Sequence, residues 1–529
     1  MTTSCEFDRL FTQTVPHILE KIFLSLDFKS YMNCMEASRS WNDLLTSESF
    51  QRKGKTVFCE DIQRELQIAA EKGNLVMIQR LLSSFMVDLN FMTEWKESPL
   101  ILAARNAHKD VAQLLLDSGA APNMAAQNGK TPLYFAAFEG HKDVVKLLLD
   151  RGANRNTADQ DKFTPLHCAA QKGHKEAVQL LLDGGAELNK ADRAGRTPLH
   201  WAAYKGHKDV VQLFLDKGLE QNMAEQIGRT PLYFAALEGH KDVVQLLLDR
   251  GAELNTAYQD GLTPLHNAAR RGHKDVVQLL LERGAEPKMA AQFGNTPMYY
   301  AALEGHKDVV QLLLDRGVEP NTVVEQNGLT PLHTAALKGH KDVVQLLLNK
   351  GAEPNKGIPN GTTSLHIAAH GGYKGVVKLL LDSGAKPNLT KHNGITPLYR
   401  AAQSDNSGKN DVVLLLLDRG AKPNMANQYG TTPLHWAAHD GVKDLAQLLL
   451  DRGADPNTAD QDGVTPLHSA ATSAEYLPAL EGHKEVVKLL LDRGAKPNMA
   501  DHTGMTPLAR ALQRGNIDIA NILKDYGGA

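Results

Sequence analysis

The amino-acid sequence predicts an all-α solenoid, in which one small helical unit is stacked many times. The first observation is that a Thr-Pro-Leu phrase, in most copies followed by His or Tyr, recurs with a period of 33 residues between Thr131 and Thr296. The second is that two short apolar stripes with helical spacing follow each copy. The full set of signature residues is Ser98, Thr131, Thr164, Thr197, Thr230, Thr263, Thr296, Thr330, Thr363, Thr396, Thr432, Thr465 and Thr506. A fixed period of this length indicates stacked units rather than a globule.

The first fifty residues lie outside the repeat and predict three short helices. The apolar residues after Val15-Pro16 have the spacing of one helical face, namely Ile18, Leu19, Ile22, Phe23 and Leu26. Two further stripes follow around residues 31–38 and 41–45. A bundle of about 40 residues is below the size at which a core is self-sufficient. We therefore expect these helices to need a partner, which is either the adjoining repeats or another protein.

Residues 164–189 represent one unit of the repeat. Thr164 is a preferred helix N-cap, and the proline that follows it suits the first turn. Gly173 predicts the end of this first helix. A second helix is predicted from near His174, with an apolar stripe on its core side, and Gly185 ends it. Helices this short are marginal alone, so the units must be stabilised by their neighbours.

These residues resemble the ankyrin repeat, whose signature includes Thr-Pro-Leu-His-x-Ala. The resemblance implies about 14 helix-turn-helix units with β-turn or hairpin tips over residues 61–529, the first of them centred on Arg64. Terminal units of such stacks carry a polar outer face. In the last unit, Arg510, Arg514, Asn521 and Lys524 replace smaller or apolar residues and match this expectation.

Two units are longer than the others. Thr396 to Thr432 spans 36 residues and Thr465 to Thr506 spans 41, and the extra polar residues lie near 404–410 and 472–483. We expect both insertions to form loops between the two helices of their units, because lengthening a surface loop costs little. The sequence slightly favours tolerated insertions over binding loops.

Residues 15–55 resemble an F-box, after an N-terminal tail of residues 1–14. The resemblance rests on Pro16, Ile18, Leu19, Ile22, Phe23, Leu26, Asp27, Trp41 and Phe50. It implies that Pro16, Ile18, Leu19, Ile22, Phe23 and Leu26 bind the Skp adaptor of cullin–RING ubiquitin ligases. Two departures are Val15, where leucine is usual, and the stretch Met35-Glu36-Ala37-Ser38 before the tryptophan. The alternative is that these helices only cap the repeat array.

Composition argues for a protein that binds other proteins. The net charge is −3, which disfavours a surface dominated by nucleic-acid phosphate contacts. No apolar run approaches the length of a membrane span, and four unpaired cysteines suit the cytosol or the nucleus. Neither a catalytic motif nor a cofactor motif is present, so we expect no enzyme activity, no cofactor and no metal. The histidines recur at two fixed places in each unit, which predicts structural roles.

The recurrent turn asparagines have two interpretations. They occur at Asn123, Asn156, Asn189, Asn255, Asn355, Asn388, Asn424, Asn457 and Asn498. The favoured interpretation is that each side chain hydrogen-bonds to the backbone of its own turn. The resemblance to ankyrin proteins also implies that some could be substrates for hydroxylation.

Comparison of the repeats with each other predicts where a partner binds. The second helix is nearly constant, whereas the residues at the turn tips, before the threonine and after the Ala-Ala pair vary. By resemblance these line the concave face of an ankyrin array. Aromatic residues and arginines dominate interface energetics. The candidates are therefore Tyr204, Arg229, Arg270, Arg271, Phe293, Tyr429 and Trp436, together with Trp201. For the two tryptophans, packing into the neighbouring repeat is as favoured as binding.

The expected function follows from both resemblances. The F-box would bind the Skp adaptor and, through it, the cullin complex, while the repeats would bind an unidentified protein substrate. The chain would then be the substrate-recognition subunit of an SCF-type ubiquitin ligase. The alternative is an ankyrin scaffold that has no link to a ligase.

Overall fold

The computed structural model describes residues 59–84, 87–92, 97–324, 326–472 and 477–529. The chain is divided into two compact units, residues up to Glu253 and residues from Leu254 onward, and each unit is described by itself. Within the described residues the regular structure is helical, apart from an isolated bridge between Gly357 and Thr363. The predicted all-α class is therefore confirmed.

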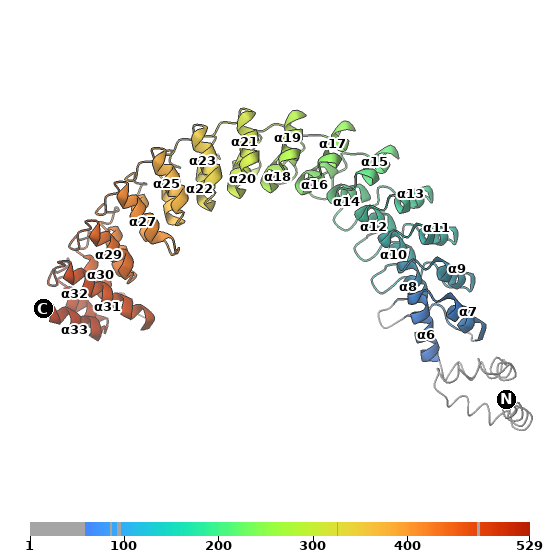
Figure 1. Ribbon diagram of the computed structural model, residues 1–529, viewed down its shortest axis with the longest axis horizontal. Coiled ribbons are helices and arrows are strands. Elements are labelled where there is room, and N and C mark those ends of the chain that lie inside the picture. Colours follow the sequence, from blue (N-terminus) through green and yellow to red (C-terminus); the bar gives the residue numbers. More distant parts are fainter. Residues whose placement is uncertain (1–58, 85–86, 93–96, 325, 473–476) are drawn as a thin grey trace, which may run out of the picture. The chain divides into compact units, whose positions relative to one another are not determined.

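In the first unit each repeat contributes a first and a second helix. The first helices are α6 (Cys59–Lys72), α8 (Pro99–Arg105), α10 (Pro132–Glu139), α12 (Pro165–Lys172), α14 (Pro198–Lys205) and α16 (Pro231–Glu238). The second helices are α7 (Leu75–Ser84), α9 (Lys109–Asp117), α11 (Lys142–Asp150), α13 (Lys175–Asp183), α15 (Lys208–Asp216) and α17 (Lys241–Asp249). First helices pack against first helices of adjacent repeats, and second helices against second helices, so that the unit has two layers (Figure 1).

The second unit repeats this arrangement. Its first helices are α18 (Pro264–Arg271), α20 (Pro297–Glu304), α22 (Pro331–Lys338), α24 (Ser364–His370), α26 (Pro397–Ala402), α28 (Pro433–His439), α30 (Pro466–Thr472) and α32 (Pro507–Gln513). Its second helices are α19 (Lys274–Glu282), α21 (Lys307–Asp315), α23 (Lys341–Asn349), α25 (Lys374–Asp382), α27 (Lys409–Asp418), α29 (Lys443–Asp451), α31 (Leu477–Asp492) and α33 (Ile517–Asp525). A short 3-10 turn, η1 (Gln292–Gly294), lies at one hairpin tip.

The signature residues form the helix ends that the sequence predicts. Thr164 has extended backbone and accepts a hydrogen bond from the backbone of the third helical residue, His167, and the intervening Pro165 occupies the first turn. Gly173 ends α12 in the left-handed conformation, with φ of 79°. The second helix begins at Lys175, one residue after the predicted start, and Gly185 follows its end with φ of 82°.

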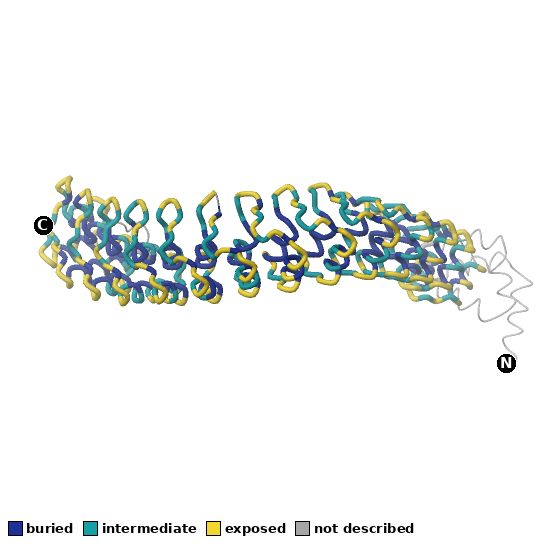
Figure 2. The backbone as a smooth tube through the Cα atoms, turned by 90° about the horizontal axis from the view of Figure 1, so that it is seen from above, coloured by how far each residue is buried: buried dark blue, intermediate teal, exposed yellow. Residues whose placement is uncertain are grey.

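The core lies between the two helix layers. The Ala-Ala pair of each first helix and the apolar stripe of each second helix are almost completely buried, for example Ala169, Ala170, Val178 and Leu181 at 0% exposure. The small alanines let neighbouring first helices approach closely. The hairpin tips extend from the helix layers and are mostly half-buried or exposed (Figure 2).

Only one of the two insertions forms the expected loop. Around 404–410, Ser404 is buried and the Asn406 amide donates to the His370 carbonyl of the preceding repeat at 3.1 Å, while α27 already begins at Lys409. In the longer insertion, residues 477–483 form the first turns of α31, which extends the second helix to 16 residues. The first insertion therefore forms the expected loop between α26 and α27, whereas the described part of the second forms helix instead. The added residues are tied to the preceding repeat or lengthen a helix.

The last repeat has the expected polar residues with one exception. Arg514, Asn521 and Lys524 are exposed. Arg510 is half-buried and forms an ion pair with Asp501, so it is part of the interior of this repeat rather than of a polar outer face.

Candidate protein-binding surface

Two positions on each first helix generate a continuous surface within each unit. They lie four and seven residues after the signature threonine, and residues three apart share one side of a helix. In adjacent repeats the second position contacts the first position of the next helix. Arg105, for example, lies with its guanidinium carbon 4.3 Å from the Phe135 ring centroid. We call the surface formed by these two positions the first-helix face.

In the first unit this face carries a cluster of aromatic rings. Trp201 on α14 lies edge-to-face with Phe163, from the hairpin tip of the preceding repeat, at 5.2 Å between centroids. It also lies edge-to-face with Tyr204, at 6.0 Å, and Tyr204 in turn contacts Phe234 on α16 at 6.0 Å. These distances are within the range for favourable aromatic pairs. The rings form one connected cluster over three consecutive repeats.

Two arginines pack on this cluster. The guanidinium carbon of Arg196 lies 5.2 Å from the centroids of both Trp201 and Phe234. Arg229 lies 5.1 Å from Phe234. Contacts at these distances are favourable cation–π interactions. The buried Nε atom of Arg196 has no hydrogen-bond partner, so part of its hydrogen-bonding capacity is unused.

A carboxylate holds each of these arginine-bearing tips. Glu225 lies 2.9 Å from Arg229 in an ion pair and is almost fully buried. Burial alone would raise the pKa of the Glu225 carboxyl, but the hydrogen bonds and charge of Arg229 outweigh it and keep that pKa below its usual value. The equivalent Asp192 accepts hydrogen bonds from the backbone of Ala194 and Arg196, both at 2.9 Å, and from the Trp201 indole at 3.0 Å. The tip, the arginine and the tryptophan are therefore positioned by the same side chain.

The predicted binding residues are distributed over both units. In the first unit, Tyr204 and Arg229 both contact the Phe234 ring. Trp201 belongs to the same cluster and is half-buried. In the second unit Arg270 and Arg271 are exposed, and Arg270 lies 5.8 Å from the Tyr300 ring. Trp436 is half-buried and stacks on His439 at 5.9 Å.

Two further candidates protrude from hairpin tips. Phe293 is 54% exposed and Tyr429 is 60% exposed, which is unusual for large aromatic side chains. Each occupies the third position before its signature threonine. They occupy equivalent positions in different repeats and do not form a common site, because three other hairpin tips lie between them in the sequence. The proposed adaptor-binding residues 16–26 lie outside the described residues.

The sequence interpretation did not select Phe163, Arg196 or Phe234 as binding residues. Phe163 and Arg196 each lie directly before a signature threonine, which is one of the positions that vary between repeats. Phe234 is 3% exposed and acts as the floor of the cluster. These residues could have been found from the stacking of the repeats. The tip of one repeat contacts the first helix of the next, at the position four residues after its threonine.

The histidines have the structural roles predicted for them. The Nδ1 atom of His167 accepts a hydrogen bond from the Thr164 backbone at 3.2 Å, and its Nε2 atom donates to the Arg196 carbonyl of the next repeat at 3.1 Å. Only a neutral ring both accepts and donates, and burial lowers the pKa of His167 to about 4. The second histidine of each repeat also bridges, for example His240 to the Tyr204 carbonyl at 3.0 Å. No group of three metal-ligating side chains occurs in the part of the chain that the structure describes.

The turn asparagines bridge repeats instead of closing their own turns. Asn123 accepts a hydrogen bond from the backbone of Asn154 at 2.6 Å and donates to the Gly152 carbonyl at 3.3 Å, both in the next repeat. Asn388 and Asn424 make the same pair of contacts. The expectation of bonding within the same turn is therefore wrong for these residues, although the bonds are to backbone as expected.

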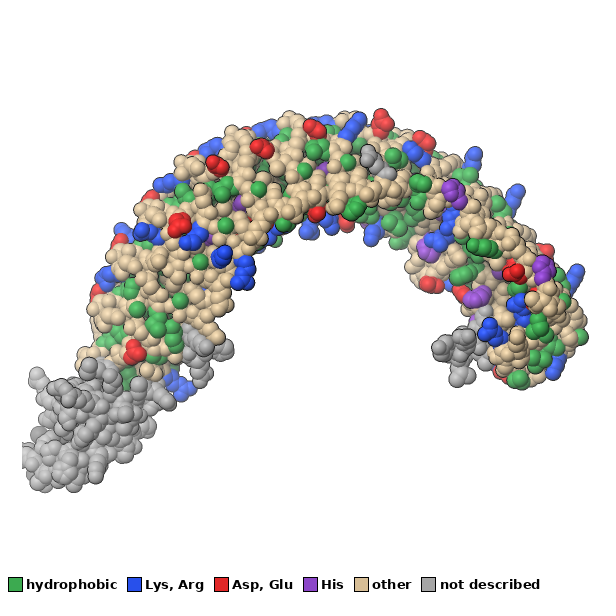
Figure 3. Space-filling model, turned by 180° about the vertical axis from the view of Figure 1, so that it is seen from behind, with side chains coloured by type: hydrophobic (Ala, Val, Ile, Leu, Met, Phe, Trp, Pro, Cys, Tyr) green, Lys and Arg blue, Asp and Glu red, His purple; other side chains and the backbone are tan. Residues whose placement is uncertain are grey.

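The surface as a whole is mixed in charge. Figure 3 shows Lys and Arg side chains interspersed with Asp and Glu on the side that faces the viewer. Many of these charges form ion pairs between the second helices of adjacent repeats, such as Arg250 with Asp216 at 2.7 Å. Among the described helices, none is both long and apolar enough to cross a membrane.

Comparison with known proteins agrees with both resemblances. A family model described as ankyrin repeats (3 copies) matches overlapping segments from residue 66 to residue 529, and the F-box domain model matches residues 15–53. Cortactin-binding protein 2 of Rattus norvegicus is 39% identical over 64 residues, which are 12% of this chain and 4% of that protein. The chain therefore spans only a small part of the length of this relative. Because the ankyrin model covers most of the chain, the protein belongs to the ankyrin-repeat family, and it carries an F-box domain at its N-terminus.

Proposed function

We propose that this protein is the substrate-recognition subunit of an SCF-type ubiquitin ligase. The observation that carries the proposal is the combination of an F-box at residues 15–53 with a repeat array whose first-helix face presents half-buried rings and arginines. The F-box binds the Skp adaptor, and the array holds a protein substrate. The chain contributes proximity rather than chemistry, because tethering raises the effective concentration of substrate lysines near the conjugating enzyme.

The aromatic cluster of the first unit is the proposed substrate-binding site. Rigid aromatic side chains and arginines are the residue types that account for most binding energy in protein interfaces. Trp201 and Tyr204 are held in place by Asp192, Phe163 and Phe234, so little side-chain entropy is lost when a partner binds. Arg196 packs on both Trp201 and Phe234, which fixes its guanidinium beside the rings.

The adaptor half of the proposal is tested with the full-length chain. Purified protein is mixed with recombinant Skp adaptor and analysed by size-exclusion chromatography, alongside the double variant Pro16→Ala, Leu19→Ala. We expect a stable complex with the wild-type chain and its loss with the double variant. If the wild-type chain does not bind the adaptor, the ligase proposal fails and the scaffold alternative stands.

The substrate half is tested with a second pair of variants. Proximity labelling in cells identifies proteins that associate with the wild-type chain, and the same experiment is done with Tyr204→Ala and with Lys208→Ala. Tyr204 lies in the cluster, whereas Lys208 is exposed at the start of the second helix α15. We expect Tyr204→Ala to lose partners that Lys208→Ala keeps, while both variants still bind the adaptor. Equal loss or equal retention by the two variants contradicts the proposed site.

A further inference from the structure

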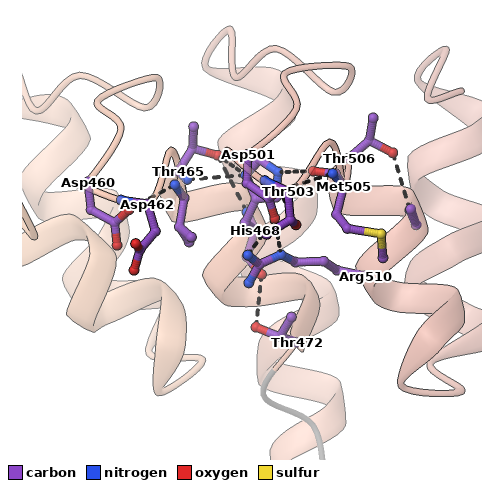
Figure 4. A network of polar contacts seen from close by, with 12 residues as sticks. Asp460, Asp462, Thr465, His468, Thr472, Asp501, Thr503, Met505, Thr506 and Arg510 are labelled. Atoms are coloured by element: carbon purple, nitrogen blue, oxygen red, sulfur yellow. Dashed lines mark hydrogen bonds and ion pairs between the residues drawn. The ribbon is translucent and has the colours of Figure 1, made fainter.

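In two repeats of the array, an acidic residue on the hairpin tip binds a donor side chain on the first helix. The acid lies five residues before the signature threonine and the donor lies four residues after it. In the last repeat these are Asp501 and Arg510, and the Asp501 carboxylate accepts from Arg510 Nε at 2.7 Å and from its Nη2 at 2.5 Å (Figure 4). In the first unit they are Asp192 and Trp201, joined by the indole hydrogen bond at 3.0 Å. A carboxylate thus binds the donor on the first helix.

The acid in this pair also closes the hairpin tip. The second oxygen of Asp501 accepts from the backbone of Thr503 at 2.8 Å and of Met505 at 3.0 Å. Its side chain is fully buried, and the hydrogen bonds outweigh the cost of burial, so the pKa of Asp501 lies well below its usual value. The acid is therefore charged and paired on both sides in this repeat.

The repeat that begins at Thr396 carries a cation in place of the acid. Its two positions are Lys391 and Arg400, on the tip and on α26. The tip still closes, because the Lys391 backbone donates to the Ile395 carbonyl at 3.1 Å and its carbonyl accepts from Gly394 at 2.9 Å. Arg400 retains a hydrogen bond to the Gln403 side chain at 3.3 Å. Over the residues that the structure describes, neither cation forms an ion pair with a carboxylate.

A third basic side chain borders this pair. His370 occupies the seventh position of the preceding first helix, α24, the position that faces the next first helix along the stack. Burial first, and then the charges of Arg400 and Lys391, lower the pKa of His370, while Asp405 acts in the opposite direction. Burial and the charge of Arg400 also lower the pKa of Lys391. Lys391 and Arg400 are both half-buried. Their positive charges therefore repel each other where water screens them only partly.

We propose that Lys391 and Arg400, bordered by His370, form a docking site for an acidic peptide segment of a partner protein. A carboxylate of that segment pairs with Arg400, as the Asp501 carboxylate pairs with Arg510 in the last repeat. Arginine binds a carboxylate through two parallel hydrogen bonds, and a partly buried pair of this kind is strong. The chain has a net charge of −3, and the basic cluster is local. Nucleic-acid binding depends on many phosphate contacts, so this cluster favours a peptide.

The inference deepens the proposed function, because it assigns a class of partner segment to the first-helix face of the second unit. It does not depend on the F-box or on the aromatic cluster of the first unit. Failure of adaptor binding therefore leaves the docking site standing, and loss of the docking site leaves adaptor binding unchanged.

The test measures binding of a fluorescent peptide to the full-length chain by fluorescence anisotropy. The probe is a short flexible peptide rich in Glu, and its partner control has every Glu replaced by Gln. Lys391→Asp restores the acid that other repeats carry at this position, so that Arg400 is paired internally. We expect this variant to fold normally, to resist denaturant at least as well as the wild-type chain, and to bind the Glu peptide about tenfold more weakly.

A matched variant separates a site from general electrostatics. Lys307→Asp makes the same change of charge on the exposed start of α21, in the same unit. We expect it to leave the affinity for the Glu peptide nearly unchanged. The proposal is overturned if the wild-type chain binds the Glu and Gln peptides equally, if both variants weaken binding to the same degree, or if a single-stranded oligonucleotide displaces the peptide at a lower concentration than unlabelled peptide does. If Lys391→Asp does not fold, Lys391→Met removes the charge alone and must show the same loss of affinity.

Discussion

The junctions, where side chains of one repeat bond to the backbone of the next, and the first-helix face are built from the same short helices. They differ in how much their side chains vary from repeat to repeat. At the junctions, the same few side chains recur, including a buried histidine that accepts from its own threonine and donates to the next repeat. On the face, the position four residues after the threonine is Trp201 in one repeat, Phe234 in the next and Arg400 in another. The junctions therefore carry stability and the face is free to vary. Substitutions at the junctions should therefore lower stability more than substitutions on the face do.

The largest difference is expected on acidification. Burial lowers the pKa of five junction histidines to about 4, and these are His167, His200, His266, His333 and His366. Because each folded pKa is below the unfolded value, the unfolded chain binds more protons at intermediate pH. The stabilisation is fully present above about pH 6.5 and is lost as the pH falls towards 4.

This acid sensitivity is checked by urea unfolding at about pH 7 and pH 5. Each such histidine should lower the free energy of unfolding by about 2 kcal/mol at the lower pH. The chain itself offers the control, because Tyr399 occupies in the next repeat the position that His366 occupies in its own. His366→Tyr should therefore reduce the loss between the two pH values. An unchanged pH dependence in this variant would show that acid acts elsewhere.

A second difference concerns two glycines with the same backbone conformation. Gly206 has φ of 78°, and a Cβ atom there would lie 2.5 Å from the ring of His240, the histidine that bridges to Tyr204. Gly218 has φ of 84°, and nothing lies within 4 Å of its Cβ position. Gly206→Ala should cost roughly 3 kcal/mol, because the strain of a left-handed alanine adds to a displaced hydrogen bond. Gly218→Ala should cost only the strain, about 1 kcal/mol.

Chemical denaturation of the two variants measures this difference directly. Native-state hydrogen exchange adds where the chain opens, and we expect the excess cost of Gly206→Ala to appear in the repeats on both sides of His240. Equal destabilisation by the two substitutions would mean that the close approach of Gly206 to His240 adds nothing to the stability of the junction.

A smaller effect is expected at a tip where a glycine is missing. Lys162 has φ of 62° at a tip position that is glycine in most repeats, such as Gly195. Lys162→Gly should stabilise the chain by about 1 kcal/mol, since only glycine adopts this conformation without strain. The side chain of Lys162 is exposed, so no contact is lost in exchange. A variant that is less stable than the wild-type chain would contradict this account.

Much of the fold could be predicted from the sequence because it is repetitive. A threonine cap, a proline in the first turn and a terminal glycine are local signals, and they place α12 and its equivalents to within a residue. The role of Asn123 could not be predicted, because its partner backbone lies in the next repeat and local reasoning places the bond within the turn. The same limit applies to the aromatic cluster. Phe163 and Trp201 are far apart in the sequence and meet only when repeats stack.

The smallest expected effect on stability is also the one that separates fold from binding most directly. Phe293 has φ of 70° and the following Gly294 has φ of 79°, as in a type I′ turn, where asparagine is the preferred first residue. A phenylalanine in this conformation is strained, and its exposed ring makes this tip a candidate for binding a partner. Phe293→Asn should stabilise the chain by about 0.5 kcal/mol, because asparagine tolerates the left-handed region.

The same variant should lose affinity for any partner that contacts this tip. Stability is measured by denaturant unfolding, and partner binding by proximity labelling with Tyr429→Asn as the matched change at another tip. Because Tyr429 is not among the non-glycine residues with positive φ, its replacement removes an exposed ring without relieving strain. A gain in stability for Phe293→Asn with no change in partners would mean that the strained ring has no part in binding. Loss of partners with a gain in stability would show that this tip trades stability for recognition.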